Sequence, residues 1–489
     1  ASGIDCIDRN PVRITERLGS SAAHIYGKEI CFSETFGGFG WNLTTEEMKR
    51  RVDLQYVQGV NMFVPHAFFY STDGIRKTES PPSLFLQNGY WKYFGQFSDY
   101  AKRLSYIGRS GNFVADAAIY FPVKTAWAEF RPLYRFFLHE LDEQILALTE
   151  ELNGGGIVFD FLDDTGIGRC ERKGKTLTGI EKSAYKAIIL PSVTVMPEKT
   201  LEKIADFAKH GGFVLSVGDF DPVDETGNRS ERFTAALIEL KKSVGYKALK
   251  KHREDEALSA LKEALPHDVV SGDASGVFVL KRTDGVTEIR FLVNTEDKEK
   301  SFAIRGEGFS SAEIWNAENG ETYPADFAAK NGGEANIVLP PFGSVIVAFT
   351  RENLTPAGKT EERRLADITC GWKIAGEDKI AKRADFFSAG KENFSGEVTF
   401  VKETDIAPQE THGRTILKLE DVADYASVSV NGEFAGARLW APYTFDLTGK
   451  LHAGKNEIAV TIGSTEENAM TGSNKNAGVF GSIGIFEVK

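Results

Sequence analysis

The sequence predicts a multidomain protein that is α/β in its first half and all-β in its second half. A chain of 489 residues is longer than one hydrophobic core supports, so three or four units are expected. Up to about residue 266, apolar strand-like segments alternate with amphipathic helices, and from residue 267 short strands are joined by Gly, Asn and Asp turns. With 42% hydrophobic and 26% charged residues, the chain has the composition of ordinary folded domains.

The first unit, residues 1–110, is predicted to be the C-terminal part of a TIM barrel. Helices are predicted over 13–27, 44–59 and 90–108, and strands over 28–34 and 60–71. Thr44 and Glu47 are spaced as a capping box at the start of the second helix. Strands that are apolar on both faces and alternate with helices indicate a parallel sheet. Because a closed barrel has eight strands in about 250 residues, we expect the other strands to lie upstream of this chain.

The second unit, residues 111–266, is predicted to be an open, doubly wound sheet of flavodoxin-like or amidotransferase-like type. Strands are predicted over 114–122, 156–163, 187–193 and 212–218, with helices over 135–152 and 197–211. Ser192 stands at the turn where an amidotransferase would carry its nucleophilic cysteine. Asp163 and Asp164 end one strand, where a solvated loop pair is favoured over an acid/base dyad. We therefore expect a non-catalytic domain.

The second half of the chain is predicted to contain two β domains, over 267–351 and 352–489. Short strands with turn residues between them are typical of a β-sandwich. The polar stretch 350–364 is predicted to be the linker between the two domains. In the second domain, Asn431 and Gly432 form a dipeptide typical of a type I′ hairpin turn.

Charge and cysteine content exclude several classes of function. A net charge of −12 argues against a nucleic-acid partner, because such proteins neutralise phosphates with clustered Lys and Arg. No apolar run approaches the length of a membrane span, so no membrane partner is expected. The cysteines are far apart: Cys6, Cys31, Cys170 and Cys370. They predict buried thiols in a reducing, cytoplasmic compartment, with no disulfide framework and no zinc site. No other metal site and no cofactor are predicted.

One short segment carries the pattern of a functional site. In "CFSETFGGFGW", residues 31–41, a strand ends in Glu34 and opens into a loop of glycines and aromatic rings. Glu34 is either a functional carboxylate or a structural one, paired with an Arg or capping the helix that begins near Thr44. His66, after the next strand, is either a substrate contact or a satisfied histidine under a loop. The residues alone leave these alternatives open.

The C-terminal sequence resembles a known accessory domain. "SVSVNGEFAGARLWAPYTFDLT", residues 427–448, is followed by "LHAGKNEIAVTI", residues 451–462. A strand, an Asn-Gly turn, a return rich in small residues and then "GKNEIAV" recur in this order in the galactose-binding-like jelly roll that accompanies many glycoside hydrolases. The resemblance implies a galactose-binding-like jelly roll over 352–489.

The N-terminal sequence, over 20–71 and 88–122, resembles the last barrel strands of α-L-rhamnosidase-related glycoside hydrolases. In those enzymes a Ser-Glu ends the penultimate strand, "GVN" enters the last strand and a His follows it. Glu34, the segment 59–61 and His66 occupy these places. The order of barrel end, amidotransferase-like domain, β-sandwich and jelly roll also resembles these multidomain enzymes.

The resemblance implies a role for each candidate residue. Glycosidic cleavage needs two carboxyl groups, and Glu34 corresponds to the nucleophile or general base. The resemblance places the general acid on an earlier strand, so we expect the chain by itself to be incomplete and inactive. His66 and Asn61 are predicted to bind substrate. The loop glycines are expected to let the backbone fold back, so that nearby rings stack on a sugar: Phe36, Phe39 and Trp41.

These observations predict the C-terminal portion of a glycoside hydrolase that acts on sugars derived from plant or bacterial polysaccharides. A carbohydrate substrate is the expected partner. The alternative is a non-catalytic carbohydrate-binding or scaffolding protein. Because two barrel strands by themselves would leave backbone edges and an apolar face uncovered, self-association through the N-terminal region is also expected.

Overall fold

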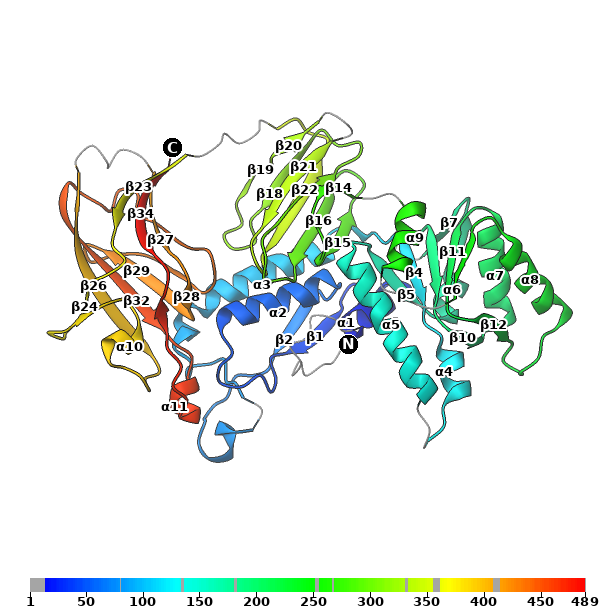
Figure 1. Cartoon of the computed structure of the whole chain (residues 1–489), viewed down its shortest axis with the longest axis horizontal. Helices are drawn as coiled ribbons and strands as arrows, with labels where there is room; N and C mark the ends of the chain where they lie inside the picture. The colour runs from blue at the N-terminus through cyan, green and yellow to red at the C-terminus, as the bar shows by residue number, and fades with distance from the viewer. Residues whose placement is uncertain are drawn as a thin grey trace.

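A computed structural model shows a mixed α/β and β-rich protein built from several packed units (Figure 1). In Figure 1 the N-terminal helices and strands lie in the centre, an α/β unit lies to the right, one β unit lies above and another lies to the left. The structure describes residues 14–79, 81–132, 136–179, 183–250, 255–265, 268–329, 333–354, 361–407 and 414–488.

The N-terminal unit contains a two-stranded parallel sheet. Its helices are α1 (Thr15–Ile25), α2 (Thr45–Val57) and α3 (Phe94–Arg109), with short 3₁₀ turns η1 (Gly74–Lys77) and η2 (Gly89–Tyr93). The strands β1 (Phe32–Thr35) and β2 (Met62–Pro65) pair with Glu34 opposite Val64. The Thr44 hydroxyl accepts from the Glu47 amide at 3.1 Å, which confirms the predicted start of α2. Both strands are shorter than predicted. In the second, the residues after His66 leave the sheet and bond to the 83–87 segment.

The second unit is a five-stranded, all-parallel sheet in the order β13-β11-β9-β4-β5. Its strands are β4 (Ala117–Tyr120), β5 (Phe159–Leu162), β9 (Ala187–Leu190), β11 (Phe213–Val217) and β13 (Tyr246–Leu249). Its helices are α4 (Val123–Glu129), α5 (Phe136–Gly154), α6 (Asp164–Arg169), α7 (Glu198–Lys209), α8 (Glu231–Lys242) and α9 (Glu256–Ala264). Small additional sheets are formed by β6 (Glu171–Lys173), β7 (Thr176–Thr178) and β8 (Ala184–Tyr185), and by β10 (Val193–Val195) and β12 (Phe220–Val223). Strands β4, β5 and β9 are buried along their whole length, as expected for a sheet that is covered on both faces.

The third unit pairs a six-stranded sheet with a four-stranded one. The first sheet has the order β19 (Thr322–Pro324), β18 (Ser311–Trp315), β22 (Ser344–Thr350), β16 (Glu288–Asn294), β15 (Val277–Thr283) and β3 (Asn112–Phe113). The second has the order β14 (Val269–Gly272), β17 (Lys300–Arg305), β21 (Glu334–Leu339) and β20 (Phe327–Ala328). Apolar side chains from both sheets form one cluster between them, which is the packing of two facing sheets.

The C-terminal unit also has two antiparallel sheets. One has the order β25 (Ile380–Ala381), β24 (Trp372–Ile374), β26 (Glu397–Ile406), β32 (Gly454–Gly463), β29 (Tyr425–Val430) and β30 (Glu433–Arg438). The other has the order β23 (Glu362–Asp367), β34 (Ile483–Val488), β27 (Arg414–Leu419) and β31 (Tyr443–Asp446). Smaller elements are β28 (Val422–Ala423), β33 (Gly478–Val479), α10 (Phe386–Ala389) and α11 (Glu467–Thr471). Asn431 and Gly432 have φ of 52° and 82° between β29 and β30, which confirms the predicted hairpin turn.

One hydrophobic core joins all four units. It runs from the N-terminal helices through the α/β unit into the sheet that contains β15 and β16, and it includes Trp440 of the C-terminal unit. Trp440 is 5% exposed, lies 5.5 Å from the ring of Tyr100 on α3, and donates its indole N–H to Glu318 at 2.9 Å. The C-terminal unit is therefore packed against both the N-terminal unit and the third unit.

Candidate functional site

The carboxyl ends of β1 and β2 bring Glu34 and His66 to one edge of the sheet. Glu34 lies opposite Val64 in the parallel register. The His66 amide donates to the Thr35 carbonyl at 2.8 Å, so the pairing continues one residue past β2. Strand alternation turns Ser33 and Thr35, which are fully buried, away from the face that carries Glu34. Functional groups of parallel βα units gather at this end of the strands.

Neither structural alternative for Glu34 is found in the structure. Its half-buried carboxylate has no hydrogen bond or ion pair to any described residue. The helix start that it was considered to cap is capped by Thr44. The Nδ1 atom of His66 is also buried without a hydrogen-bond partner among these residues. Within the described part of the chain, Glu34 thus keeps an unpaired carboxylate at the sheet edge, beside a His66 ring whose Nδ1 atom is closed off from solvent.

Gln55 of α2 fixes the strand that carries Glu34. Its side-chain oxygen accepts from the Thr35 hydroxyl at 2.9 Å, and its amide nitrogen donates to the Ser33 hydroxyl at 3.2 Å. Both hydroxyls flank Glu34 in sequence and lie on the buried face. Gln55 is 1% exposed, so these two hydrogen bonds lie in a water-poor environment. In the sequence, Gln55 could have been noticed as a polar residue between the apolar Leu54 and Tyr56 in the predicted helix 44–59.

The three predicted sugar-stacking rings lie in the core, which corrects their predicted role. The exposed fractions are 0% for Phe36, 8% for Phe39 and 3% for Trp41. Phe36 packs against Phe63 and Phe97 with ring centroids 6.1 Å apart in each pair. The loop does fold back as predicted, since Phe36, Gly38 and Gly40 all have positive φ, but it turns the rings beneath the strands.

Asn61 is a structural residue, which corrects its predicted role in substrate binding. It precedes β2 and therefore lies at the opposite end of the strands from Glu34. Its side-chain oxygen accepts from the Cys31 amide at 3.0 Å, and its amide nitrogen donates to the Glu29 carbonyl at 2.8 Å. These bonds set the two strands in register from their amino ends.

The polar side chains at the carboxyl ends of the five-stranded sheet form hydrogen bonds within the protein. Asp163 caps α6 by accepting from the Gly166 amide at 2.7 Å. Asp164 accepts from the Tyr120 and Thr200 hydroxyls at 2.8 and 2.9 Å, and burial raises the pKa of its carboxyl group. Gln144 bridges the Ser192 amide and the Val217 carbonyl, which belong to neighbouring strand ends.

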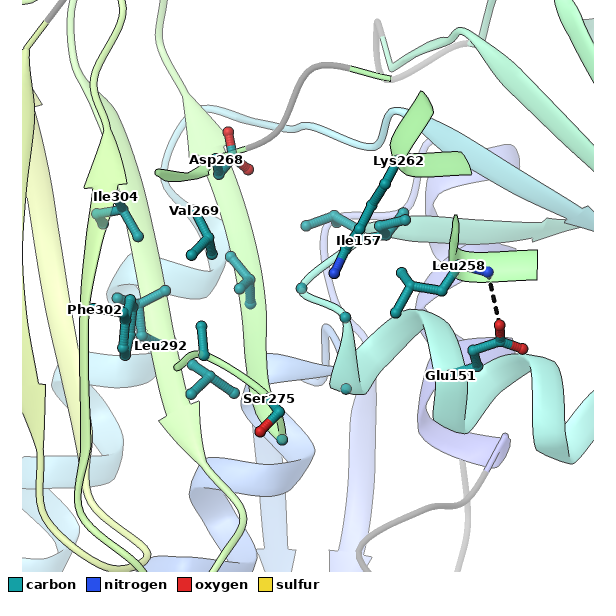
Figure 2. A pocket seen from close by; sticks show the side chains of 18 of the residues that line it. Glu151, Ile157, Leu258, Lys262, Asp268, Val269, Ser275, Leu292, Phe302 and Ile304 are labelled. Atoms are coloured by element: carbon teal, nitrogen blue, oxygen red, sulfur yellow. Dashed lines mark hydrogen bonds between the residues drawn. The ribbon is translucent and has the colours of Figure 1, made fainter. Parts of the chain in front are cut away.

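A cavity of about 1030 Å³ lies elsewhere, between the α/β unit and the third unit (Figure 2). Figure 2 shows apolar side chains on both walls, with Ile157 and Leu258 facing Val269 and Leu292 across the space. The charged groups at its rim are largely satisfied within the protein: Lys281 pairs with Asp116 and Asp268, Arg290 pairs with Glu288, and Glu151 accepts from the Leu258 amide. None of the residues at the ends of β1 and β2 lines this cavity.

Within the described residues, no group of three or more His, Cys, Asp or Glu side chains is arranged to hold a metal ion. No helix of this part of the chain is long and apolar enough to cross a membrane.

The family and the proteins that this chain resembles are all named as glycosidases. A family model described as alpha-L-rhamnosidase matches residues 8–329. The structure of a rhamnosidase from Novosphingobium sp. PP1Y superposes with a TM-score of 0.73 at 21% identity, over 96% of this chain and 48% of that one. A putative beta-glucuronidase from Formosa agariphila is 23% identical over 311 residues, which are 62% of this chain and 25% of that protein. The chain thus spans about half of the first relative and a quarter of the second.

Proposed function

The chain belongs to the alpha-L-rhamnosidase family of glycoside hydrolases, and we propose that it is the part of such an enzyme that supplies Glu34 as one of two catalytic carboxyl groups. The observation that carries the proposal is the free Glu34 carboxylate at the carboxyl end of a parallel strand, beside His66. A carboxylate that has no partner among the described residues is available for substrate or water.

The chemistry follows from the needs of glycosidic cleavage. The ionised Glu34 either attacks the anomeric carbon of a rhamnosyl unit or takes a proton from the water that does so. The second carboxyl group protonates the oxygen of the leaving group as the glycosidic bond breaks. We propose that His66, which follows β2 at the same edge, hydrogen-bonds a sugar hydroxyl or the Glu34 carboxylate. We expect both side chains to face a common cleft.

The second carboxyl group comes from outside the β1–β2 pair, since these two strands carry one acidic residue, Glu34. We propose that β1 and β2 belong to the end of a TIM barrel. In support, one face of the pair is apolar and open: Phe32, Met62 and Val64 are 39%, 42% and 46% exposed. Side chains of this type fill the interior of a barrel in layers contributed by several strands.

The remaining units are proposed to be accessory. The α/β unit over 111–266 is assigned as a non-catalytic, amidotransferase-like domain, because its strand ends are closed by hydrogen bonds. We assign 267–351 as a β-sandwich and 352–489 as a galactose-binding-like jelly roll. The paired antiparallel sheets of each unit support these assignments.

Hydrolysis of an aryl α-L-rhamnoside by the protein of the complete reading frame tests the proposal. Glu34→Gln is expected to lower kcat by at least about 10³-fold, because the amide can neither attack nor accept a proton. Glu29→Gln, which changes an exposed acid three residues before β1, is the matched control and is expected to retain the rate. The 489-residue chain by itself is expected to be nearly inactive, since loss of a general acid lowers rates by about 10² to 10⁴.

A Glu34→Gln variant that keeps more than a tenth of the rate would show that Glu34 is not catalytic. Binding of rhamnosides without turnover by the complete protein would instead support a non-catalytic carbohydrate-binding protein.

A further inference from the structure

An exposed aromatic ring follows the proposed catalytic edge in the chain. Phe68 is two residues after His66 in the loop that follows β2 and is 44% exposed. A Phe side chain gains about 1.5 to 3 kcal/mol when it is fully buried, so a ring left open to water at this place needs an explanation. The rings predicted to stack on a sugar are buried, which leaves Phe68 as a candidate for that contact.

Three aromatic rings pack against Phe68. Phe85, Trp91 and Phe94 each contact it edge to face, with centroid distances of 6.0, 5.8 and 5.8 Å. Trp91 also stacks on Phe94 at 5.3 Å. Such pairs favour one ring orientation, so the support limits the motion of Phe68 while part of its surface remains open.

The backbone around Phe68 is also fixed. The Leu84 amide donates to the Ala67 carbonyl at 2.8 Å, and the Phe69 amide donates to the Ser83 hydroxyl at 3.1 Å. The Gln87 side chain donates to the Phe69 carbonyl at 3.1 Å and accepts from the Ser83 hydroxyl at 2.7 Å. A ring held in this way loses little conformational entropy when a ligand binds to it.

We propose that Phe68 is the stacking surface for the sugar ring on the leaving-group side of the scissile bond. This assignment rests on the proposed function. The C–H face of a pyranose is apolar, and a fixed aromatic ring removes it from water. Phe68 lies further along the loop from the strand end than His66, and four residues beyond the residue that pairs with Glu34. The rhamnosyl ring occupies the Glu34 and His66 position, and the next sugar outward reaches Phe68.

Binding measurements on the 489-residue chain test the assignment without turnover. Trp91 contacts Phe68, so we expect its fluorescence to report a ligand on that ring. The probes are an α-L-rhamnosyl-glucose disaccharide and methyl α-L-rhamnopyranoside. Phe68→Ala is expected to weaken binding of the disaccharide about tenfold, which lies within the range measured for aromatic stacking. The affinity for the methyl glycoside should not change. Phe68→Tyr keeps the ring and should bind the disaccharide normally.

Tyr70→Ala is the matched control, because Tyr70 is fully exposed at 101% in the same loop. In the complete enzyme, Phe68→Ala should raise KM for the disaccharide about tenfold with kcat unchanged. A purely structural loss would lower the thermal midpoint and affect both ligands alike. If Phe68→Ala fails to fold, Phe68→Leu, which keeps the apolar volume without an aromatic face, takes its place and is expected to lose the same affinity.

The outcomes separate the two proposals. Unchanged disaccharide affinity in Phe68→Ala, together with an inactive Glu34→Gln enzyme, overturns the stacking assignment and leaves the function standing. Equal weakening of both sugars in a folded Phe68→Ala variant overturns the leaving-group assignment. Selective weakening of the disaccharide together with an active Glu34→Gln enzyme supports the sugar contact and rejects the catalytic role of Glu34.

Discussion

Two parallel sheets in this molecule have the same basic construction but differ at their carboxyl ends. At the end of the five-stranded sheet, Asp163 caps a helix, and Asp164 accepts hydrogen bonds from two hydroxyl groups. At the end of β1 and β2, Glu34 has no partner among the described residues, and neither has the Nδ1 atom of His66. Both edges have the position where α/β proteins bind ligands.

The comparison shows that position alone does not identify a functional edge. A carboxylate whose lone pairs are already used by the protein contributes to structure, whereas an unpaired one is available to a ligand. The open edge also belongs to the sheet with an uncovered apolar face, whereas β4 and β5 are buried throughout.

Replacing equivalent carboxylates at the two edges should have opposite consequences for activity. Glu34→Gln is expected to lower kcat at least about 10³-fold, whereas Asp164→Asn should leave it within about twofold. Burial raises the pKa of Asp164, so a neutral amide is tolerated there, and the expected loss of stability is about 1 kcal/mol or less. Steady-state kinetics and urea unfolding measure both effects. Loss of turnover in Asp164→Asn would mean that the closed edge takes part in the chemistry.

Phe36→Ala should lower the free energy of unfolding by about 3 to 5 kcal/mol, because a fully buried ring is removed next to the open edge. The affinity for methyl α-L-rhamnopyranoside should not change in the variant that remains folded. Urea unfolding and sugar titration make the measurement, with the exposed Tyr70→Ala as control. A stable Phe36→Ala variant that binds the sugar more weakly would show that Phe36 contributes to the sugar-binding site.

Asp160 connects the five-stranded sheet to helix α1 of the N-terminal unit, and its removal should make stability less dependent on pH. The buried carboxylate on β5 accepts from Ser21 of α1 at 2.9 Å and from Tyr185 at 2.7 Å, and it pairs with His24 at 2.9 Å. Burial by itself would raise the pKa of Asp160, but His24, Tyr185 and Arg17 together hold it below its usual 3.8. Asp160→Asn is expected to cost about 2 kcal/mol at pH 7.

The sign of the pH effect follows from this lowered pKa. As the pH falls, the unfolded chain takes up the proton first, so the contribution of Asp160 is complete above about pH 5 and is lost progressively below about pH 4. The difference in unfolding free energy between wild type and Asp160→Asn should therefore shrink from pH 7 to pH 3. A constant difference across this range would contradict the lowered pKa.

The smallest effect is expected on the open apolar face. Phe32→Ser combined with Val64→Ser should weaken self-association of the 489-residue chain several-fold, because burying apolar area contributes about 25 cal/mol per Å². Stability should change by only about 1 kcal/mol, since both side chains are already 39% and 46% exposed. Sedimentation equilibrium measures the association. A wild-type chain that stays monomeric at all concentrations would show that the predicted self-association is wrong.

Local signals in the sequence predicted local structure well. The capping residue Thr44 and the hairpin turn at Asn431 and Gly432 depend on neighbouring residues alone, and the structure confirms them. The common edge of Glu34 and His66 could also be predicted, because each follows an apolar strand of a βα unit.

The side-chain environments could not be predicted in the same way. A run such as "HAFFYS", residues 66–71, has no periodicity that separates the exposed Phe68 from its less exposed neighbour Phe69. The orientation of Phe36 depends on a loop whose positive φ values turn it under the sheet. The role of Asn61 depends on the parallel partner strand, which lies thirty positions earlier at Cys31 and is paired only in the folded chain.

The burial of Trp440 between α3 and Glu318 has a consequence for how freely the C-terminal unit can move. An accessory domain on a flexible tether searches a volume, and its effective concentration near the catalytic centre falls as the tether lengthens. A domain that is fixed by a shared core keeps one position relative to the rest of the protein. The shared core therefore holds the C-terminal unit at one constant distance from Glu34.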